Sequence, residues 1–167
     1  MKKGIDEKDL RILEILQKNG KMTSKEISKI LKIPITTVFT KIKRMEKEGI
    51  IKEYRAIVDS NKLGYNTLAF ILASVSYRTE KENKILSQRE IAKEIAKFPE
   101  VQEVHIITGD WDLLIKIRER DVEKIGKFVI DKLRYVAGIE KTLTCVVFET
   151  VKETTYLPVE NNWIKKG

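Results

Sequence analysis

The sequence has little of the chemistry that disulfides and metal centres require. Among its 167 residues there is one cysteine, Cys145, and one histidine, His105. A single cysteine excludes a disulfide within the chain, and one cysteine with one histidine does not supply the ligand set of a zinc site. We therefore expect neither a metal ion nor another cofactor.

Long apolar runs are also missing. No stretch reaches the roughly 18 apolar residues of a membrane helix, and the opening residues MKKGID lead into acidic residues rather than the apolar core of a signal sequence. The sequence also contains no Gly-rich phosphate loop and no nucleophile motif. We expect a cytoplasmic protein that makes no contact with a membrane.

Positive charge is abundant, and it is concentrated in the first third of the chain. The formal net charge is +8, and residues 1–59 hold 15 Lys and Arg against 9 Asp and Glu, whereas residues 60–167 hold 18 against 16. A basic surface on a small domain favours a polyanion, because each neutralised phosphate releases counterions. Scattered charges would indicate solubility alone, so the placement of these charges on helices decides between the two interpretations.

The first third predicts three helices. Apolar residues at helical spacing follow Asp6, a suitable N-cap, and stop at Asn19–Gly20. The spacing of Thr23 and Glu26 is that of a capping box, which begins a short second helix. The third helix is expected from about Pro34 to Glu48, because proline suits a first turn and a glycine follows.

The third predicted helix carries the strongest indication of function. With Val38, Ile42 and Met45 facing inward, the opposite face is polar and basic, and no acidic residue lies between Pro34 and Met45. Small hydroxyl residues allow a helix to approach base edges, and cations reach the phosphates on either side. The pattern predicts a major-groove helix that binds double-stranded DNA. Its candidate contact residues are Thr36, Thr37, Thr40, Lys41, Lys43, Arg44 and Lys47.

The remaining residues predict mostly strands. Residues 50–59 are rich in β-branched and aromatic residues and predict a strand that forms the wing of the DNA-binding unit. Further strands are expected at 68–77, 101–108, 113–117 and 139–151, with a helix in each of the two long gaps. The order β-α-β-β-α-β gives an antiparallel sheet with both helices on one face. Because the strand at 68–77 is apolar on both faces, a partner subunit is the expected cover of the other face.

The expected fold class is therefore α+β. An N-terminal winged helix-turn-helix unit (1–59) is joined by a linker (60–66) to a C-terminal ferredoxin-like βαββαβ domain (67–152), and a tail (153–167) follows.

Short motifs recur along almost the whole sequence in a characteristic order and spacing: Ile5–Asp9, Ile12–Leu13, Leu16–Gln17, Leu31–Gly49, Gly49–Tyr54, Leu63–Tyr65, Pro99–Val101, Thr108–Asp112 and Gly138–Thr144. In this order and spacing the sequence resembles the Lrp/AsnC family of bacterial and archaeal transcription regulators. Two departures concern function: Ile33–Thr37 stands where the family commonly has Ser-Pro-Ser-like residues, and Trp111 replaces the usual Tyr or Phe.

The resemblance implies an assembly and an effector. Subunits would form a homodimer through their exposed sheet faces, and dimers would assemble into a tetramer or octamer with an amino acid bound where dimers meet. Gly109 would allow close backbone approach, Asp110 or Asp112 would receive the effector ammonium, and Thr142 and Thr144 would offer hydroxyls. From the residues alone, Gly109–Asp110 is also a good tight turn, and alternating threonines are ordinary strand surface.

Two other function classes stay open. Some haem-pathway decarboxylases resemble the family in both halves, but the His- and Arg-containing stretch expected at their reaction site is replaced here by His105–Gly109. An oligomeric regulatory module that does not bind DNA is the second alternative. Enzyme chemistry would leave the basic third helix unexplained, and direct measurement of duplex binding separates the second alternative. We expect no enzyme but a sequence-specific DNA-binding transcription regulator, modulated by an amino acid or a related small metabolite.

Overall fold

A computed structural model describes residues 4–76 and 87–159, and the chain divides into two compact units. The first unit combines residues 1–57 with residues 152–167, and the second unit comprises residues 58–151. The chain therefore passes between the units twice. The predicted end of a strand at Tyr77, the polar stretch after it and residues 160–167 lie outside the described residues.

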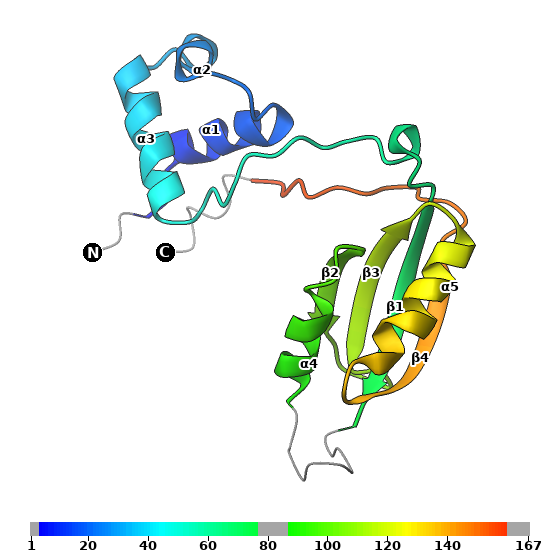
Figure 1. The fold of residues 1–167 in the computed structure, drawn as a ribbon. Coiled ribbons are helices and arrows are strands. Elements are labelled where there is room, and N and C mark those ends of the chain that lie inside the picture. Colours follow the sequence, from blue (N-terminus) through cyan, green and yellow to red (C-terminus); the bar gives the residue numbers. More distant parts are fainter. Residues whose placement is uncertain (1–3, 77–86, 160–167) are drawn as a thin grey trace. The chain divides into compact units, whose positions relative to one another are not determined.

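The first unit is a three-helix arrangement whose helices begin where the sequence predicts (Figure 1). The side chains of Asp6 and Thr23 accept hydrogen bonds from backbone N–H groups in the first turns of their helices, and both capping boxes are complete. The three helices bury one apolar cluster that includes Ile12, Ile27 and Val38. The bounds are α1 Glu7–Lys18, α2 Ser24–Leu31 and α3 Ile35–Lys47.

A tight connection sets the entry of the chain into α3. Lys32 ends α2 in the left-handed conformation, with φ of 53°. The Ser28 hydroxyl donates to the Ile33 carbonyl at 2.6 Å, and the Ile33 N–H donates to the Ser28 carbonyl at 3.2 Å. These reciprocal bonds fix the turn between α2 and α3, because they satisfy backbone groups that the end of a helix leaves open.

The prediction of a strand at residues 50–59 is wrong, since the described chain contains no strand there. Both Ile50 and Ile51 donate their N–H groups to the Met45 carbonyl, at 2.9 and 3.1 Å, and their side chains pack on the helical cluster. Beyond them the chain is exposed, and Ile57 is 88% exposed. The β-branched composition favours extended backbone, but a strand also requires a neighbouring strand for its N–H and C=O groups.

The C-terminal segment of the first unit is anchored on α1. The Leu157 N–H donates to Gln17 Oε1 at 2.8 Å, and Gln17 Nε2 donates to the Leu157 carbonyl at 3.0 Å. One amide side chain thus satisfies both backbone groups of a residue 140 positions later in the chain. The segment predicted as a tail therefore contributes contacts to the DNA-binding half of the sequence.

The second unit has the predicted βαββαβ order and a ferredoxin-like sheet. Its strand order is β2-β3-β1-β4, and every neighbouring pair is antiparallel. Short 3-10 turns lie at Asn61–Leu63 and Leu133–Tyr135. The bounds are β1 Thr67–Val75, α4 Gln88–Ile95, β2 Val101–Ile106, β3 Leu113–Glu119, α5 Val122–Asp131 and β4 Ile139–Val146.

Both helices of this unit cover the same face of the sheet (Figure 1), as predicted. On that face Ile71 and Ile115 are fully buried against the helices, with Ile125 of α5 among the core residues. The other face carries apolar side chains that neither α4 nor α5 covers. Strand register places these residues side by side, and we call them the open sheet face: Phe70, Leu72, Leu114 and Leu143.

Candidate functional site

The outward face of α3 combines hydroxyl, basic and apolar side chains. Val38, Ile42 and Met45 are buried, so the helix presents its opposite side to solvent. Among the predicted DNA-contacting residues, Thr36, Thr40, Lys43 and Lys47 are exposed, whereas Thr37 is half-buried at the flank. Two residues that the sequence interpretation passed over, Ile35 and Phe39, lie at the edge of this face and are 47% and 56% exposed.

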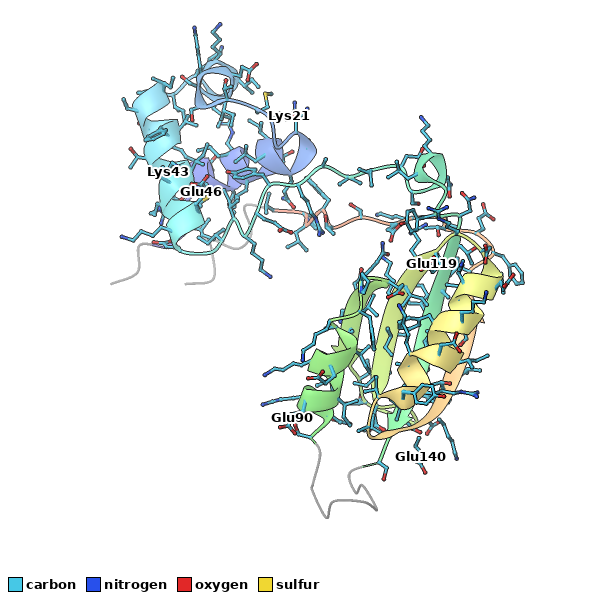
Figure 2. The ribbon with its side chains drawn as sticks, viewed as in Figure 1. Lys21, Lys43, Glu46, Glu90, Glu119 and Glu140 are labelled. Atoms are coloured by element: carbon cyan, nitrogen blue, oxygen red, sulfur yellow. The ribbon has the colours of Figure 1, made fainter. Side chains whose placement is uncertain are left out.

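Lys43 is held on this face by weak interactions. Its Nζ lies 2.9 Å from Glu46 Oε2 and 6.0 Å from the centre of the Phe39 ring. Lys43 and Glu46 are both labelled on α3 in Figure 2. The hydrogen bond from Lys43 lowers the pKa of Glu46, and Tyr54 also donates a hydrogen bond to Glu46. Because an exposed ion pair of this kind contributes little stability, Lys43 can exchange Glu46 for a phosphate at small cost.

Lys41 and Arg44 have a different environment. Lys41 Nζ lies 3.1 Å from Asp9 Oδ1, Arg44 Nη2 lies 2.5 Å from Asp9 Oδ2, and Asp9 is fully buried. Lys41 also pairs with Asp6. We call Asp6, Asp9, Lys41 and Arg44 the Asp9 cluster. Two of the seven predicted DNA-contacting residues therefore have acidic partners on α1.

The Asp9 cluster ties the start of α1 to α3. The Asp9 carboxylate also accepts the Asp6 N–H at 2.9 Å, so it belongs to the capping box as well as to the ion pairs. Burial raises the pKa of Asp6, but hydrogen bonds from Lys41 and from the Asp9 N–H outweigh it and lower that pKa to about 2. The cluster thereby holds α3 in place against the start of α1.

A hollow lies at the N-terminal end of the outward face of α3. It has a volume of about 310 Å³ and is lined by Ser24 of α2 together with Ile35, Thr36, Phe39 and Thr40 of α3. The N-cap of α3 is Pro34, which offers no side-chain hydrogen bond, and its first turn contains no acidic residue. The start of the helix therefore offers open backbone N–H groups and its positive dipole end to an anion.

The predicted effector turn lies between β2 and β3. Gly109 has a φ of 113°, a conformation that favours glycine, and Asp110 beside it is exposed. Asp112 is engaged: its Oδ2 accepts the Val75 N–H at 2.9 Å and its Oδ1 accepts Gln88 Nε2 at 2.5 Å. Asp112 thus joins the turn to the end of β1 and to the start of α4.

The predicted threonines lie across β1 from this turn. Strand register pairs Thr142 with Ala73 and Thr144 with Ile71, so both threonines lie on the helix-covered side of the sheet and are half-buried. The Asp112 N–H donates to the Ala73 carbonyl at 3.0 Å. Thr142 and the turn therefore flank the same residue of β1, about two strand spacings apart, roughly 10 Å, and Thr144 is one step further away.

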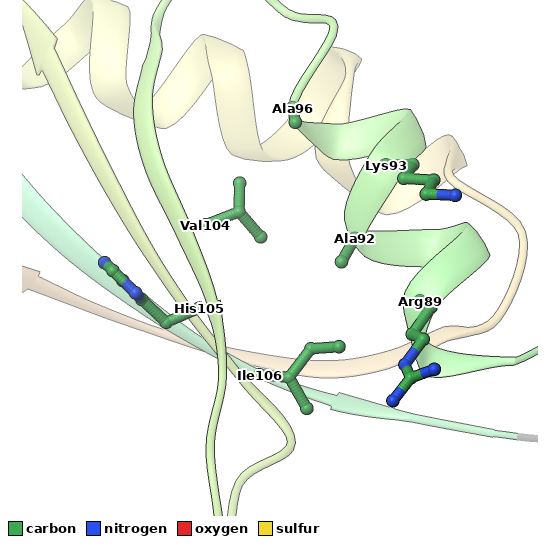
Figure 3. A pocket seen from close by; sticks show the side chains of 7 residues that line it. All are labelled: Arg89, Ala92, Lys93, Ala96, Val104, His105 and Ile106. Atoms are coloured by element: carbon green, nitrogen blue, oxygen red, sulfur yellow. The ribbon is translucent and has the colours of Figure 1, made fainter. Parts of the chain in front are cut away.

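A second hollow lies in the second unit, between α4 and β2. Its volume is about 470 Å³, and none of the predicted effector residues lines it. In Figure 3 Arg89 and Lys93 extend from α4, the small side chains of Ala92 and Ala96 leave space beside them, and Ile106 faces them from β2. The hollow has apolar walls and a cationic rim.

The described residues offer little that would suit a catalytic site, a metal centre or a membrane protein. His105 Nε2 lies 3.1 Å from Glu103 Oε2, but both side chains are about half exposed and Glu103 is shared with Lys116. Residues 4–76 and 87–159 contain no group of three or more His, Cys, Asp or Glu that could hold a metal ion. No helix among them has the length and apolarity to cross a membrane.

A helix-turn-helix unit with a basic outward helix, followed by a ferredoxin-like unit, defines a DNA-binding transcription regulator with a ligand-binding domain. Residues 5–52 match the family model described as winged helix-turn-helix DNA-binding, and residues 69–157 match the Lrp/AsnC ligand binding domain. The chain belongs to the Lrp/AsnC family.

Relatives and solved structures agree with this assignment. The chain is 46% identical over 149 residues to an uncharacterized HTH-type transcriptional regulator of Pyrococcus abyssi, covering 89% of this chain and 96% of that protein. It is 41% identical over 156 residues to the HTH-type transcriptional regulator FL11 of Pyrococcus furiosus, covering 93% and 97%. A crystal structure of the Neisseria meningitidis transcriptional regulator NMB0573 in complex with L-Met is similar, with a TM-score of 0.85 and 28% identity over 96% of this chain and 99% of that one. Escherichia coli AsnC follows with a TM-score of 0.80 and 25% identity, covering 92% and 99%.

Proposed function

We propose that the chain recognises a specific sequence of double-stranded DNA through the outward face of α3. The observation that carries the proposal is the exposure of hydroxyl and basic side chains on a face without an acidic residue in its first turn. Lys41 and Arg44, which bind Asp9, position α3 and do not supply its main phosphate contacts. The proposed DNA-contacting residues are Thr36, Thr37, Thr40, Lys43 and Lys47.

Selection of bound sites from random duplexes tests this proposal. The full-length protein is expected to enrich one sequence, and Thr36→Ala combined with Thr40→Ala is expected to relax the enriched positions, because both side chains lie on the outward face. Ser87→Ala, which removes a cap in the second unit, serves as the matched loss of a hydroxyl. Failure of the unaltered protein to enrich any sequence would favour a regulatory module that does not bind DNA.

We also propose a homodimer that assembles further, with the open sheet face as the contact surface. Leu143 on this face is 47% exposed, and its strand neighbours Leu72 and Phe70 are apolar as well. Neither α4 nor α5 covers this apolar face, and its burial against a second copy would lower the free energy of the assembly because apolar surface leaves water.

Leu143→Glu is expected to turn the dimer into a monomer at micromolar concentration, because a charge would be buried in the contact. Sedimentation of the full-length protein measures this. Tyr135→Glu, at a residue that is 83% exposed in the same unit, is expected to leave the assembly unchanged. An unaltered protein that sediments as a folded monomer would contradict the proposed contact.

We propose an amino acid as the effector, bound at the turn after β2. Support comes from the glycine at φ 113°, from the exposed Asp110 and from the L-Met complex of the Neisseria regulator. The Asp110 carboxylate receives the ammonium, and Gly109 permits close approach. Thr142 and Thr144 remain proposed contacts, whereas Asp112 shapes the turn through its bonds to Val75 and Gln88.

Calorimetry across the common amino acids, with and without the selected duplex, is expected to find one ligand whose affinity changes when DNA is bound. A ligand that alters DNA affinity must have its own affinity altered equally. Asp110→Asn is expected to lower the affinity for the ligand at least tenfold, because a charge-assisted hydrogen bond is lost. It is expected to leave DNA binding by the unliganded protein intact. Asp131→Asn, another exposed carboxylate of the unit, is the control. If Asp110→Asn and Asp131→Asn bind the ligand with equal affinity, Asp110 does not contact it. The hollow between α4 and β2 would then be the next site to test.

A further inference from the structure

We propose that Ile35 and Phe39 recognise thymine, with the 5-methyl group of the base seated in the hollow beside them. The inference rests on the proposed DNA binding by α3 and adds the chemistry of the base that is recognised. It concerns two residues that neither polarity nor charge would select as DNA contacts.

The two side chains are placed for contact with another molecule. Ile35 and Phe39 are one helical turn apart, so they lie together at the border between the buried stripe of α3 and its polar face. They are 47% and 56% exposed, although each is large and apolar. Both line the hollow of about 310 Å³, which makes the exposed apolar surface concave.

Thymine is the base whose chemistry fits this surface. In the major groove the four bases present hydrogen-bond donors and acceptors, and only thymine adds a methyl group. Ile35 and Phe39 offer no hydrogen-bond partner, so a polar base edge pressed against them would lose its bonds to water without replacement. Thr36 and Thr40 in the same lining carry hydroxyls that can bond the polar atoms beside the methyl group.

The charges around the hollow favour DNA over an apolar peptide as its occupant. Lys43 Nζ lies 6.0 Å from the centre of the Phe39 ring, and Lys47 follows one turn later on the same face. The first turn of α3 contains no acidic residue and has no side-chain cap. A phosphate backbone on either side of a base would meet these cations and the helix N-terminus at once.

Replacement of each thymine in the selected duplex by deoxyuridine, one at a time, removes the methyl group and nothing else. At one or two positions the full-length protein is expected to bind the deoxyuridine duplex about fourfold more weakly. This is the burial free energy of a methyl-sized group, about 0.8 kcal/mol, converted at 1.4 kcal/mol per tenfold. Phe39→Ala is expected to bind the thymine and deoxyuridine duplexes equally at those positions, and Phe39→Leu to restore part of the difference.

Ile30→Ala is the matched control, because Ile30 is an apolar residue of α2 that is 51% exposed and does not line the hollow. It should keep the fourfold difference. Circular dichroism and thermal melting of Phe39→Ala should match the unaltered protein, since the side chain is outside the core. Equal affinity of the unaltered protein for every deoxyuridine duplex would overturn the thymine proposal while DNA binding stands, as would a fourfold loss that persists in Phe39→Ala. Binding to no duplex at all would overturn the proposed function itself.

Discussion

Asp9→Ala is expected to lower the free energy of unfolding of the first unit by about 3 kcal/mol, because it removes the buried partner that Lys41 and Arg44 share and leaves them only the more exposed Asp6 and Glu48. Asp9 is fully buried, binds Lys41 and Arg44, and completes the capping box of α1. Chemical denaturation of the full-length protein, followed by helical circular dichroism, measures the loss. Glu7→Ala removes an exposed acidic residue from the same helical turn and should cost far less. A loss no larger than that of Glu7→Ala would show that the cluster is dispensable.

The dependence of stability on acid pH tests the same cluster independently. The pKa of Asp6 is lowered from 3.8 to about 2 in the folded chain, so its contribution to stability is complete above pH 3.8 and is lost as the pH falls toward 2. Asp6→Asn keeps a good N-cap but removes the titration. Its stability should therefore depend less on pH in this window than that of the unaltered protein.

DNA affinity is expected to fall about 10³-fold between 50 and 200 mM salt if a dimer neutralises about six phosphates. Lys43, Lys47 and the N-terminus of α3 from each subunit provide that number of contacts. Lys47→Ala removes one cation from each subunit, so the slope of log affinity against log salt should decrease by about 1.8. Titration of a fluorescent duplex at several salt concentrations measures the slope.

Lys127→Ala is the control for this experiment. Lys127 lies on α5 of the second unit and is exposed beside Glu123, so its removal changes the net charge of the protein as much as Lys47→Ala does. The slope should not change. An affinity that is insensitive to salt would contradict phosphate contact by α3, and a slope altered equally by both variants would indicate a response to overall charge.

Much of the first unit could be predicted because its determinants are local. Capping residues and apolar spacing place all three helices, since each depends on residues within about four positions. The ion pairs of Lys41 and Arg44 with Asp9 could not be predicted in this way. A helical wheel places them away from the core stripe, but their partner Asp9 lies 32 and 35 positions earlier on another helix. Only the packing of α1 against α3 brings Lys41 and Arg44 to Asp9.

The candidate sites show the same division. The positive-φ turn at Gly109 followed from its residue types, whereas the bonds of Asp112 to Val75 and Gln88 depend on how β1 and α4 meet. Ile35 and Phe39 were passed over because the predicted contacts were chosen as the hydroxyl and basic side chains opposite the buried stripe. Phe39 lies outside the stripe of Val38, Ile42 and Met45, and this was the available indication for it. Ile35 is seven residues before Ile42 and in line with that stripe, so only the structure shows its exposure.

The anchor between Gln17 and Leu157 has a consequence for biosynthesis. The three helices leave the ribosome before the second unit, but Leu157 follows Gln17 by 140 residues. At about 5–20 residues per second, roughly 10 s separate the two ends of this contact. A nascent chain thus has the whole of its ligand-binding unit translated before its DNA-binding unit receives its last contacts. Completion of the DNA-binding unit on each new polypeptide is therefore timed by translation of the ligand-binding unit.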